Sequence, residues 1–328
     1  MTRSAILGTG SYVPDKILSN ADLEKMIDTS DQWIRERTGI RERRVAGREA
    51  AASDLGAPAA RSALEAARMA PKDVDLIIFT TLTPDTMCPA AGCWLQAAIG
   101  AHQAAAFDLN AACSGFIYGL QAADAYIRSG LMKNVLLVSV DIMTRVIDWS
   151  DRGTCVLWGD GAGAVVLSAT DEPRRGVIDS RIRSDGREAE LILIAGSGSR
   201  LAPITPQAVQ NHDHTLKMKG QGTFKTAVRC FTDVCAETLE RNGMKVSDVD
   251  VFIPHQANLR IIEAVAKRLR LSMDRVIVTI DKYGNMSSAT IPVALDEWVR
   301  EGKIRRGDHV LMAAFGGGLT WGAALVEW

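Results

Sequence analysis

The sequence predicts an α/β fold made of two similar halves, and three observations indicate it. Residues 74–80 and 135–140 are continuous apolar runs, which are typical of strands buried on both faces of a sheet. Between such runs lie segments whose apolar residues have helical spacing. A unit in which a helix leads into an apolar strand occurs before residues 76–79 and again before 251–253. Alternation of helices with buried strands is the pattern of α/β proteins.

The repeated unit has a constant offset of 175 residues. Its first copy contains Leu64-Glu65, Met69 and Asp73-Val74-Asp75, and its second contains Leu239-Glu240, Met244 and Asp248-Val249-Asp250. A constant offset indicates an internal duplication. The stretch between the copies at 170–176 is polar and turn-rich. We therefore expect an N-terminal half over residues 1–172 and a C-terminal half over residues 173–328.

The first elements of the N-terminal half follow from strand and capping signals. Residues 4–7 predict a short strand. Asn20 is a candidate cap for a helix over 21–27, Ser30 for a second helix that carries Trp33 and Arg37, and Ser53 for a longer third helix.

Two glycine-rich stretches resemble each other in position, because one lies near the end of each half. Residues 159–163 lie between two apolar segments and predict a β-hairpin. Residues 316–318 also lie between two apolar segments and predict a second hairpin.

The composition indicates a globular protein of about two domains. The 328 residues are 47% hydrophobic, and the net charge of −1 gives no overall field for nucleic acid or a membrane. No apolar stretch reaches membrane-spanning length. Six thinly spread cysteines favour reduced thiols and a cytoplasmic location over a disulfide framework. His212-Asp213-His214 has no cysteine or further histidine close by in sequence, so we interpret it as a polar loop and expect no metal site.

The segment around Cys113 predicts a strand, a sharp turn and a helix. An apolar run at 104–110 precedes the cysteine, and apolar residues at helical spacing follow it over 116–127. A thiol at a helix N-terminus has a lowered pKa, which favours the nucleophilic thiolate. The alternative is an ordinary core cysteine, since free cysteines are among the most buried residues.

A histidine and an asparagine occupy comparable positions in the C-terminal half. His255 follows the apolar strand at 251–253, and Asn285 lies in a turn after the apolar run at 276–280. Each residue alone has an ordinary structural explanation. A histidine at the end of a strand is often structural, and an asparagine after a glycine usually forms a turn. One cysteine combined with a remote histidine and asparagine is, however, an arrangement for nucleophilic catalysis.

Four separated motifs resemble those of β-ketoacyl-acyl-carrier-protein synthase III, a family of thiolase-fold condensing enzymes. They are Asn110–Phe116 around the cysteine, Pro254–Arg260 around the histidine, Gly284-Asn285, and Phe315–Gly322. The resemblance covers nearly the whole chain in order. It implies a thiolase-like, five-layer αβαβα fold and a homodimer.

The resemblance also implies the chemistry. Cys113 would take an acyl group from acyl-CoA, and His255 and Asn285 would stabilise the enolate formed when malonyl-acyl carrier protein loses CO₂. The backbone N–H groups of Cys113 and Gly317 would form the oxyanion hole. The product would be a 3-oxoacyl-acyl carrier protein that initiates fatty acid synthesis, with CoA thioester as substrate and no cofactor. Thiolases use a second cysteine near the C-terminal glycine motif, and here no cysteine follows Cys235.

Three further groups of residues are implied by the resemblance alone. The CoA-binding group is Thr29, Trp33, Arg37, Arg152, Gly220, Phe224 and Asn258, with Trp33 and Arg152 on either side of the adenine. The acyl-pocket group is Met87, Cys88, Trp158 and Leu319. The carrier-protein docking group is Lys225, Arg260, Lys267 and Arg268, for which the alternative is a solvated helix face.

The chain departs from the common family pattern at three places. Cys88 stands where a phenylalanine is usual, in a loop that reaches the partner's acyl pocket, and Trp158 and Leu319 also replace phenylalanine. The smaller Cys88 predicts a deeper pocket and primers longer than acetyl. Residues 186–215 match the family poorly. The sequence therefore leaves two alternatives open: a related condensing enzyme or acyltransferase of secondary metabolism, of the quinolone or polyketide type, and a non-catalytic module that binds acyl-CoA or a carrier protein.

Overall fold

The computed structural model describes residues 3–172, 174–196, 198–201 and 204–328, and two main sheets form its framework. The first sheet has the order β1-β7-β6-β4-β5. Its strands are β1 (Arg3–Tyr12), β4 (Leu76–Thr80), β5 (Ala105–Leu109), β6 (Asn134–Ile142) and β7 (Asp160–Thr170). Strand β4 runs parallel to β5 and β6, whereas β7 is antiparallel to β1 and β6.

The second sheet comes from the rest of the chain and has the order β11-β12-β13-β8. Its strands are β8 (Gly176–Ser184), β11 (Val251–Pro254), β12 (His309–Gly316) and β13 (Thr320–Glu327). Strands β11 and β12 are parallel, and the other pairs are antiparallel. Each main sheet thus draws its strands from one side of residues 171–175.

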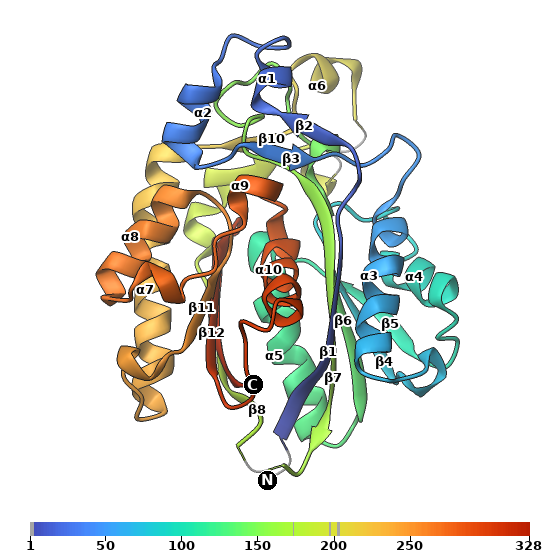
Figure 1. Ribbon diagram of the computed structural model, residues 1–328. Helices are drawn as coiled ribbons and strands as arrows, with labels where there is room; N and C mark the ends of the chain where they lie inside the picture. Colours follow the sequence, from blue (N-terminus) through green and yellow to red (C-terminus); the bar gives the residue numbers. More distant parts are fainter. Residues whose placement is uncertain (1–2, 173, 197, 202–203) are drawn as a thin grey trace.

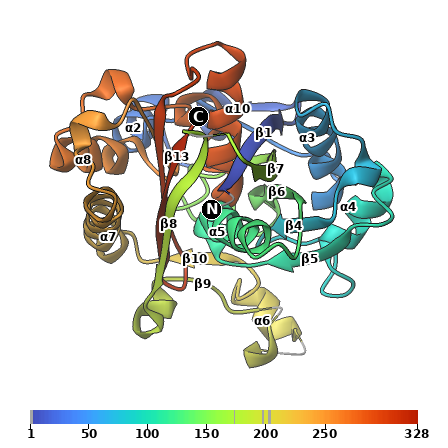
Figure 2. The ribbon, with the colours of Figure 1, turned by 90° about the horizontal axis from the view of Figure 1, so that it is seen from below.

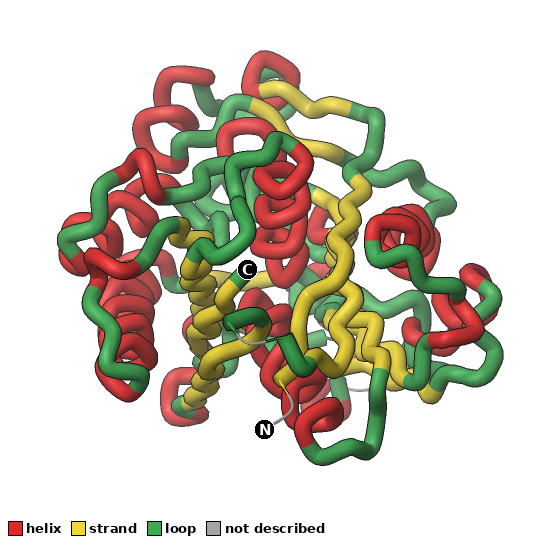
Figure 3. The backbone as a smooth tube through the Cα atoms, turned by 60° about the horizontal axis from the view of Figure 1, so that its bottom comes forward, coloured by secondary structure: helices red, strands yellow, loops and turns green. Residues whose placement is uncertain are grey.

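Helices form three layers around the two sheets (Figures 1 and 2). Helices α5 (Gly115–Arg128) and α10 (Thr290–Arg300) lie between the sheets, where Phe116, Leu120 and Leu295 belong to a core shared with strands of both sheets. The outer helices are α3 (Ala52–Ala66) and α4 (Ala91–Ile99) on the first sheet, and α7 (Gly220–Arg241) and α8 (Leu259–Leu269) on the second. Figure 3 shows the same alternation of helices and strands along the backbone. The predicted five-layer αβαβα fold is confirmed.

The structure follows the repeat found in the sequence. Helix α3 is followed by the 3₁₀ turn Pro71–Asp73 and by β4, and helix α7 is followed by the 3₁₀ turn Val246–Asp248 and by β11. Both turns and both strands begin 175 residues apart. The matching sequence positions therefore occupy matching places in the two halves.

Smaller elements cover one end of both sheets, at the top of Figure 1. They are β2 (Ile17–Ser19), α1 (Asn20–Leu23), α2 (Asp31–Thr38), β3 (Glu42–Arg44), β9 (Ile192–Ile194), α6 (Pro206–Gln210), β10 (Leu216–Met218) and α9 (Ile280–Tyr283). Ser30 caps α2 as predicted, since its side chain accepts from the Trp33 N–H at 3.1 Å. Helix α1 is capped by Ser19 rather than by Asn20, and α3 by Ala51 without a side-chain bond.

The predicted hairpin at 159–163 is wrong, because these glycines lie at the start of the long strand β7. These glycines do not form a turn; at Gly163 the absence of a side chain allows β7 to pack closely against α10. A Cβ on Gly163 would lie 2.8 Å from the Val293 backbone nitrogen and from Cβ of Pro292, both on α10. The second predicted hairpin is confirmed, since β12 and β13 are joined through residues 317–319. In the part of the chain that the structure describes, no helix combines the length and the apolar character needed to cross a membrane.

Candidate active site

Cys113 lies in the predicted turn between β5 and α5, in the 3₁₀ segment Ala112–Ser114. The turn is tight: Ala112 has a φ of +46°, which is unusual for a residue with a side chain, and its N–H donates to Asn110 Oδ1 at 3.1 Å. Such backbone conformations concentrate at functional sites. Ser114, at the end of this turn, is tied to β13, because its hydroxyl donates to the Thr320 carbonyl at 3.0 Å.

The thiol of Cys113 is protonated in its ordinary state. Burial raises its pKa to about 12, and the nearby Asp141 carboxylate adds to this effect while the Ser287 hydroxyl opposes it. The prediction of a lowered pKa is therefore wrong. Cys113 is only 6% exposed, and the desolvation of its thiol outweighs the stabilisation of a thiolate by the N-terminal end of the α5 dipole. A nucleophilic role for Cys113 requires a group that accepts its proton.

His255 directly follows β11, and its ring is enclosed by protein. The backbone N–H of His255 donates to the Ala313 carbonyl on β12 at 2.8 Å, and the ring atom Nδ1 lies 2.7 Å from Thr290 Oγ1. Burial lowers the pKa of the imidazole to about 3. His255 is therefore neutral near pH 7, with one ring nitrogen as a hydrogen-bond donor and the other as an acceptor.

Asn285 follows α9 and is held on both sides by the segment that precedes β7. Its N–H donates to the Leu157 carbonyl at 2.8 Å, and its carbonyl accepts from the Gly159 N–H at 3.1 Å. Oδ1 accepts from the Ser287 N–H at 2.8 Å. Because Oδ1 is engaged in this way, the Nδ2 amide is the group left to donate to a substrate.

Gln256 connects the histidine loop with the asparagine loop. It is fully buried, and its Nε2 donates to the Pro254 and Ile277 carbonyls at 2.8 and 3.0 Å. Its Oε1 accepts from the Thr279 N–H at 2.9 Å. One side chain thus fixes the positions of two loops, and nothing in the sequence around it distinguished it from an ordinary polar neighbour of His255.

The loops of Cys113, His255 and Asn285 meet at one point between the halves. Gly316, at the end of β12, packs so closely on the cysteine that a Cβ there would lie 2.7 Å from the Cys113 nitrogen. Strand β12 also holds His255 through Ala313, and the turn after Asn285 places Ser287 beside the thiol. The structure therefore brings together three residues that lie far apart in the sequence.

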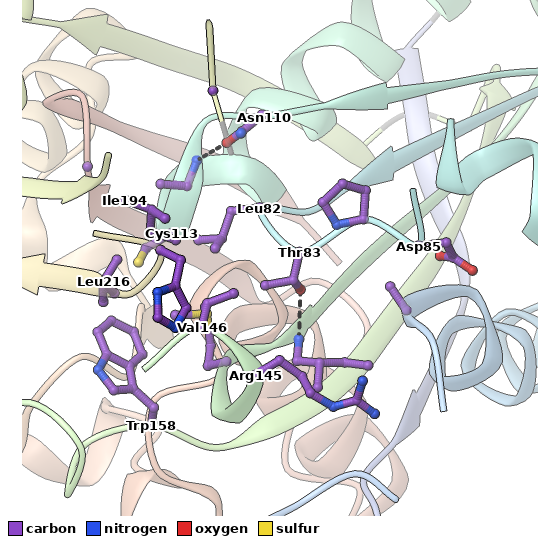
Figure 4. A pocket seen from close by; sticks show the side chains of 18 of the residues that line it. Leu82, Thr83, Asp85, Asn110, Cys113, Arg145, Val146, Trp158, Ile194 and Leu216 are labelled. Carbon is purple, nitrogen blue, oxygen red and sulfur yellow. Dashed lines mark hydrogen bonds between the residues drawn. The ribbon is translucent and has the colours of Figure 1, made fainter. Parts of the chain in front are cut away.

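A cavity of about 970 Å³ opens on Cys113. Gly317 and Cys113 both line it, which places both candidate oxyanion donors on its wall. The rest of the wall near the thiol is mainly apolar; it includes Met143, Val146, Trp158, Ile192, Ile194 and Leu216 (Figure 4). A cavity with a nucleophile on its wall and a mainly apolar lining fits an acyl chain.

Most of this wall was missed in the sequence. Ile192, Ile194 and Leu216 belong to β9 and β10, and the sequence between these strands is the stretch that resembles the family least. His214, predicted to lie in a polar loop, also lines the cavity. Residues 192–194 are a run of only three apolar residues, which is too short to distinguish a strand from a loop.

Two arginines occupy the faces of Trp33. The guanidinium carbon of Arg152 lies 4.6 Å from the ring centroid and that of Arg37 lies 5.1 Å from it. Arg152 is also held by the Asp28 carbonyl, to which it donates at 2.9 Å. An aromatic base between Trp33 and Arg152 would need a separation of about 7 Å, or two van der Waals contacts. The predicted adenine site is therefore closed by its own residues, and Arg152 must move to open it.

Comparison with known proteins identifies the family. Models of 3-oxoacyl-[acyl-carrier-protein] synthase III match residues 107–186, and models of its C-terminal part match residues 239–328. The beta-ketoacyl-[acyl-carrier-protein] synthase III of Caldanaerobacter subterraneus is 48% identical over 99% of this chain and 98% of its own length. That of Thiobacillus denitrificans is 49% identical, with full coverage of both chains. This chain belongs to the β-ketoacyl-acyl-carrier-protein synthase III family.

Solved structures of the family have the same fold. The 3-oxoacyl-[acyl-carrier-protein] synthase III of Aquifex aeolicus is 46% identical, with a TM-score of 0.92 over 99% of this chain and 100% of its own. The priming β-ketosynthase of the R1128 polyketide pathway is 37% identical, with a TM-score of 0.91 over 98% of this chain and 96% of its own. The predicted membership of the family, made on four motifs, is confirmed.

The four predicted acyl-pocket residues have different positions. Met87 and Trp158 line the cavity. Leu319 does not: it is 1% exposed and packs with Phe231 and Phe315 in the core beneath α7. Its prediction as a pocket residue is wrong for this cavity, because its side chain packs into the core of the second half. Cys88 is exposed beside the cavity, and its predicted place across a dimer interface stays a prediction.

The remaining predicted CoA-binding residues lie at or near the N-terminal ends of α2, α7 and α8. Asn258 caps α8 and donates to the Arg37 carbonyl at 3.0 Å, so it has a structural role beside any binding role. Thr29 has a buried hydroxyl with no partner among the described residues. Gly220 begins α7, and Phe224 lies one turn further along.

The four predicted docking residues are all exposed on two neighbouring helices. Lys225 is on α7, and Arg260, Lys267 and Arg268 are on α8. Helices α7 and α8 pack side by side on the second sheet (Figure 2). The four cations therefore belong to one region of the surface.

Proposed function

We propose that this protein joins an acyl-CoA primer to malonyl-acyl carrier protein by decarboxylative Claisen condensation and releases a 3-oxoacyl-acyl carrier protein. The observation that carries the proposal is the meeting of the loops of Cys113, His255 and Asn285 next to a cavity that Cys113 lines and whose wall is mainly apolar. His255 and Asn285 are buried and do not themselves line this cavity. Membership of the β-ketoacyl-acyl-carrier-protein synthase III family, whose enzymes initiate fatty acid synthesis, supports the same conclusion.

The first half-reaction forms an acyl enzyme. The S–H bond of Cys113 breaks as its sulfur attacks the thioester carbon, and neutral His255 can accept the proton at Nε2. The N–H groups of Cys113 and Gly317 then stabilise the oxyanion. When the C–S bond to CoA breaks, the CoA thiolate takes the proton and leaves as free CoA.

The second half-reaction makes the new carbon–carbon bond. The bond between the malonyl carboxylate and C2 breaks, CO₂ leaves, and the electron pair becomes an enolate. Hydrogen bonds from His255 Nε2 and Asn285 Nδ2 stabilise its oxygen. C2 attacks the acyl carbonyl, the bond to Cys113 breaks, and the thiolate recovers a proton. The two thioesters supply everything the reaction consumes apart from that proton, so it needs no cofactor or metal.

We further propose a cytoplasmic homodimer. Two observations support the dimer. Strand β5 is an edge strand of the first sheet, and the segment between β4 and β5 carries two large exposed apolar side chains, Met87 at 83% and Trp94 at 49% exposed. Exposed apolar groups near an unpaired strand edge are typical of a subunit interface.

The test is intact-protein mass spectrometry after incubation with acyl-CoAs from C2 to C12 and then with malonyl-acyl carrier protein. We expect an acyl adduct on Cys113 that disappears when the malonyl thioester is added, and no adduct in Cys113→Ala. An adduct that maps to Cys88 or Cys155 would contradict the assignment of the nucleophile. Binding without any adduct would favour a non-catalytic module.

The second candidate is a condensing enzyme of secondary metabolism. The 37% identity to the priming β-ketosynthase of the R1128 polyketide pathway supports this alternative. The chemistry at Cys113 would be the same. The acyl-CoA panel separates the two roles, because a restricted preference for an unusual primer or acceptor would favour secondary metabolism.

A further inference from the structure

The hydroxyl group of Thr290 has three hydrogen-bonding neighbours in the protein interior. Thr290 is the first residue of α10 and is fully buried. Its Oγ1 lies 2.7 Å from Nδ1 of His255, 3.3 Å from the Gln256 nitrogen and 3.1 Å from the Ser287 carbonyl oxygen. No other side chain of the described residues bonds to the His255 ring.

These neighbours differ in what they can do. The Gln256 N–H can only donate and the Ser287 carbonyl can only accept, whereas Nδ1 of a neutral imidazole does either, according to the tautomer. A hydroxyl has one proton and two lone pairs. It can therefore complement either state of Nδ1.

Two arrangements satisfy all the groups. If the hydroxyl donates to the Ser287 carbonyl, Oγ1 accepts from both Gln256 and Nδ1–H, and Nε2 is left with a free lone pair. If the hydroxyl donates to Nδ1, Nε2 carries the ring proton, and the Ser287 carbonyl still accepts from the Thr290 N–H. In either tautomer Nδ1, the Gln256 N–H and the Ser287 carbonyl all keep a partner, and a buried polar group without one would be costly.

We propose that Thr290 is a positioning residue that allows neutral His255 to adopt both tautomers in turn. The inference rests on the proposed function, whose half-reactions make opposite demands on Nε2. Acylation needs a proton acceptor there, and decarboxylation needs a donor. A change of tautomer takes up one proton at Nε2 and releases one from Nδ1, so no net proton is consumed. A carboxylate partner would hold Nδ1 protonated, and a backbone N–H would hold it unprotonated.

The test compares Thr290→Val, which keeps the shape but removes the hydroxyl, with Thr290→Ser, which keeps the hydroxyl. Thr238→Val is the matched control, since Thr238 is also fully buried in a helix but bonds only to the Val234 carbonyl at 2.8 Å. Single-turnover kinetics measure Cys113 acylation by acyl-CoA and, separately, malonyl decarboxylation by the preformed acyl enzyme. Nitrogen-15 NMR of the histidine ring, assigned with His255→Gln, measures the tautomer ratio.

We expect Thr290→Val to slow both half-reactions by about 10- to 100-fold, as when the partner that orients a functional imidazole is lost. The KM for acyl-CoA should stay unchanged, Thr290→Ser should recover both rates to within a few fold, and Thr238→Val should lower stability without selective loss of rate. The wild-type ring should contain both tautomers, and the Thr290→Val ring only one.

Three results would overturn the inference: unchanged rates in Thr290→Val, loss of only one half-reaction, or a single tautomer in the wild-type ring. The last measurement needs no turnover. A wild-type protein that forms no acyl adduct on Cys113 would instead contradict the proposed function itself.

Discussion

At the scale of single residues, the functional groups are held by the backbone of other segments. His255 is fixed through Ala313, and Asn285 through Leu157 and Gly159. Both side chains are almost completely buried, at 1% and 4% exposed. Burial then sets the protonation states, with a neutral thiol and a neutral imidazole in place of an ion pair.

Replacing Asn285 separates the two half-reactions. Asn285→Ala removes a donor to the enolate but no group that acylation uses, so decarboxylation should slow by about 10²–10³-fold, the typical cost of one such donor. Acylation of Cys113 should change much less. Single-turnover rates of both steps measure this, and equal losses would show that the site has collapsed or that the roles are wrong.

The buried imidazole of His255 should make the protein less stable as the pH falls. Its pKa falls from 6.5 to about 3 on folding, so between these values the unfolded chain binds a proton that the folded chain does not. The free energy of unfolding should therefore decrease as the pH falls below 6.5, by up to about 1.4 kcal/mol per pH unit from this residue. Urea denaturation at pH 7.5 and 5.5 should show a smaller decrease for His255→Gln than for the wild type. An identical decrease in both proteins would refute this contribution.

At the scale of elements, short segments outside the main sheets shape the substrate sites. Strands β9 and β10 provide one wall of the cavity, and helices α7 and α8 carry the exposed cations. Both features lie outside the two main sheets. Specificity for the primer and for the carrier protein is thus separable from the chemistry at Cys113.

Filling the cavity from β9 should shorten the accepted primer. Ile194→Trp places a larger ring on the wall, whereas Leu193→Trp is the matched control, since Leu193 is 37% exposed and does not line the cavity. Each methylene that loses its buried position costs about 0.8 kcal/mol. Acylation by C6 to C12 acyl-CoAs should therefore fall for Ile194→Trp, while acetyl-CoA is retained. A wild type that accepts only acetyl-CoA would contradict the prediction of a deep pocket.

Reversing charges on α8 should weaken the carrier protein selectively. Arg260→Glu with Lys267→Glu should raise the KM for malonyl-acyl carrier protein and leave malonyl-CoA nearly unaffected. The effect should shrink at high salt, because exposed charges are screened over about 8 Å at physiological ionic strength. Lys72→Glu, an exposed cation of the first half, is the control. Equal effects on both malonyl donors would exclude this region as the docking site.

At the scale of the whole molecule, the two halves meet through closely packed backbones. Gly163 of β7 lies against α10, and Gly316 of β12 lies against Cys113. Both contacts bring elements of one half onto the other. The position of the site therefore depends on how the halves pack.

A side chain at the interface should destabilise the fold. Gly163→Ala introduces a Cβ about as close as 2.7 Å to Pro292, on a helix that has no room to move between two sheets. Overpacking of this kind typically costs about 1–3 kcal/mol. Urea denaturation should show this loss, with Gly186→Ala as the control, since a Cβ at Gly186 would have no neighbour within 4 Å. If Gly163→Ala and Gly186→Ala have the same free energy of unfolding, α10 can shift to accommodate the added Cβ and the prediction is wrong.

The sequence by itself determined the layered class, the duplication, the turn at Cys113 and the family. These features depend on apolar periodicity and on short motifs, which are local properties of the chain. The structure decided the rest. It replaced the expected turn at 159–163 with a strand, because those glycines are needed for contact with residues more than a hundred positions away. It raised the pKa of Cys113, because burial depends on what covers the thiol. It also assembled the cavity wall and placed Thr290 behind His255, since neither arrangement exists until the two halves pack together.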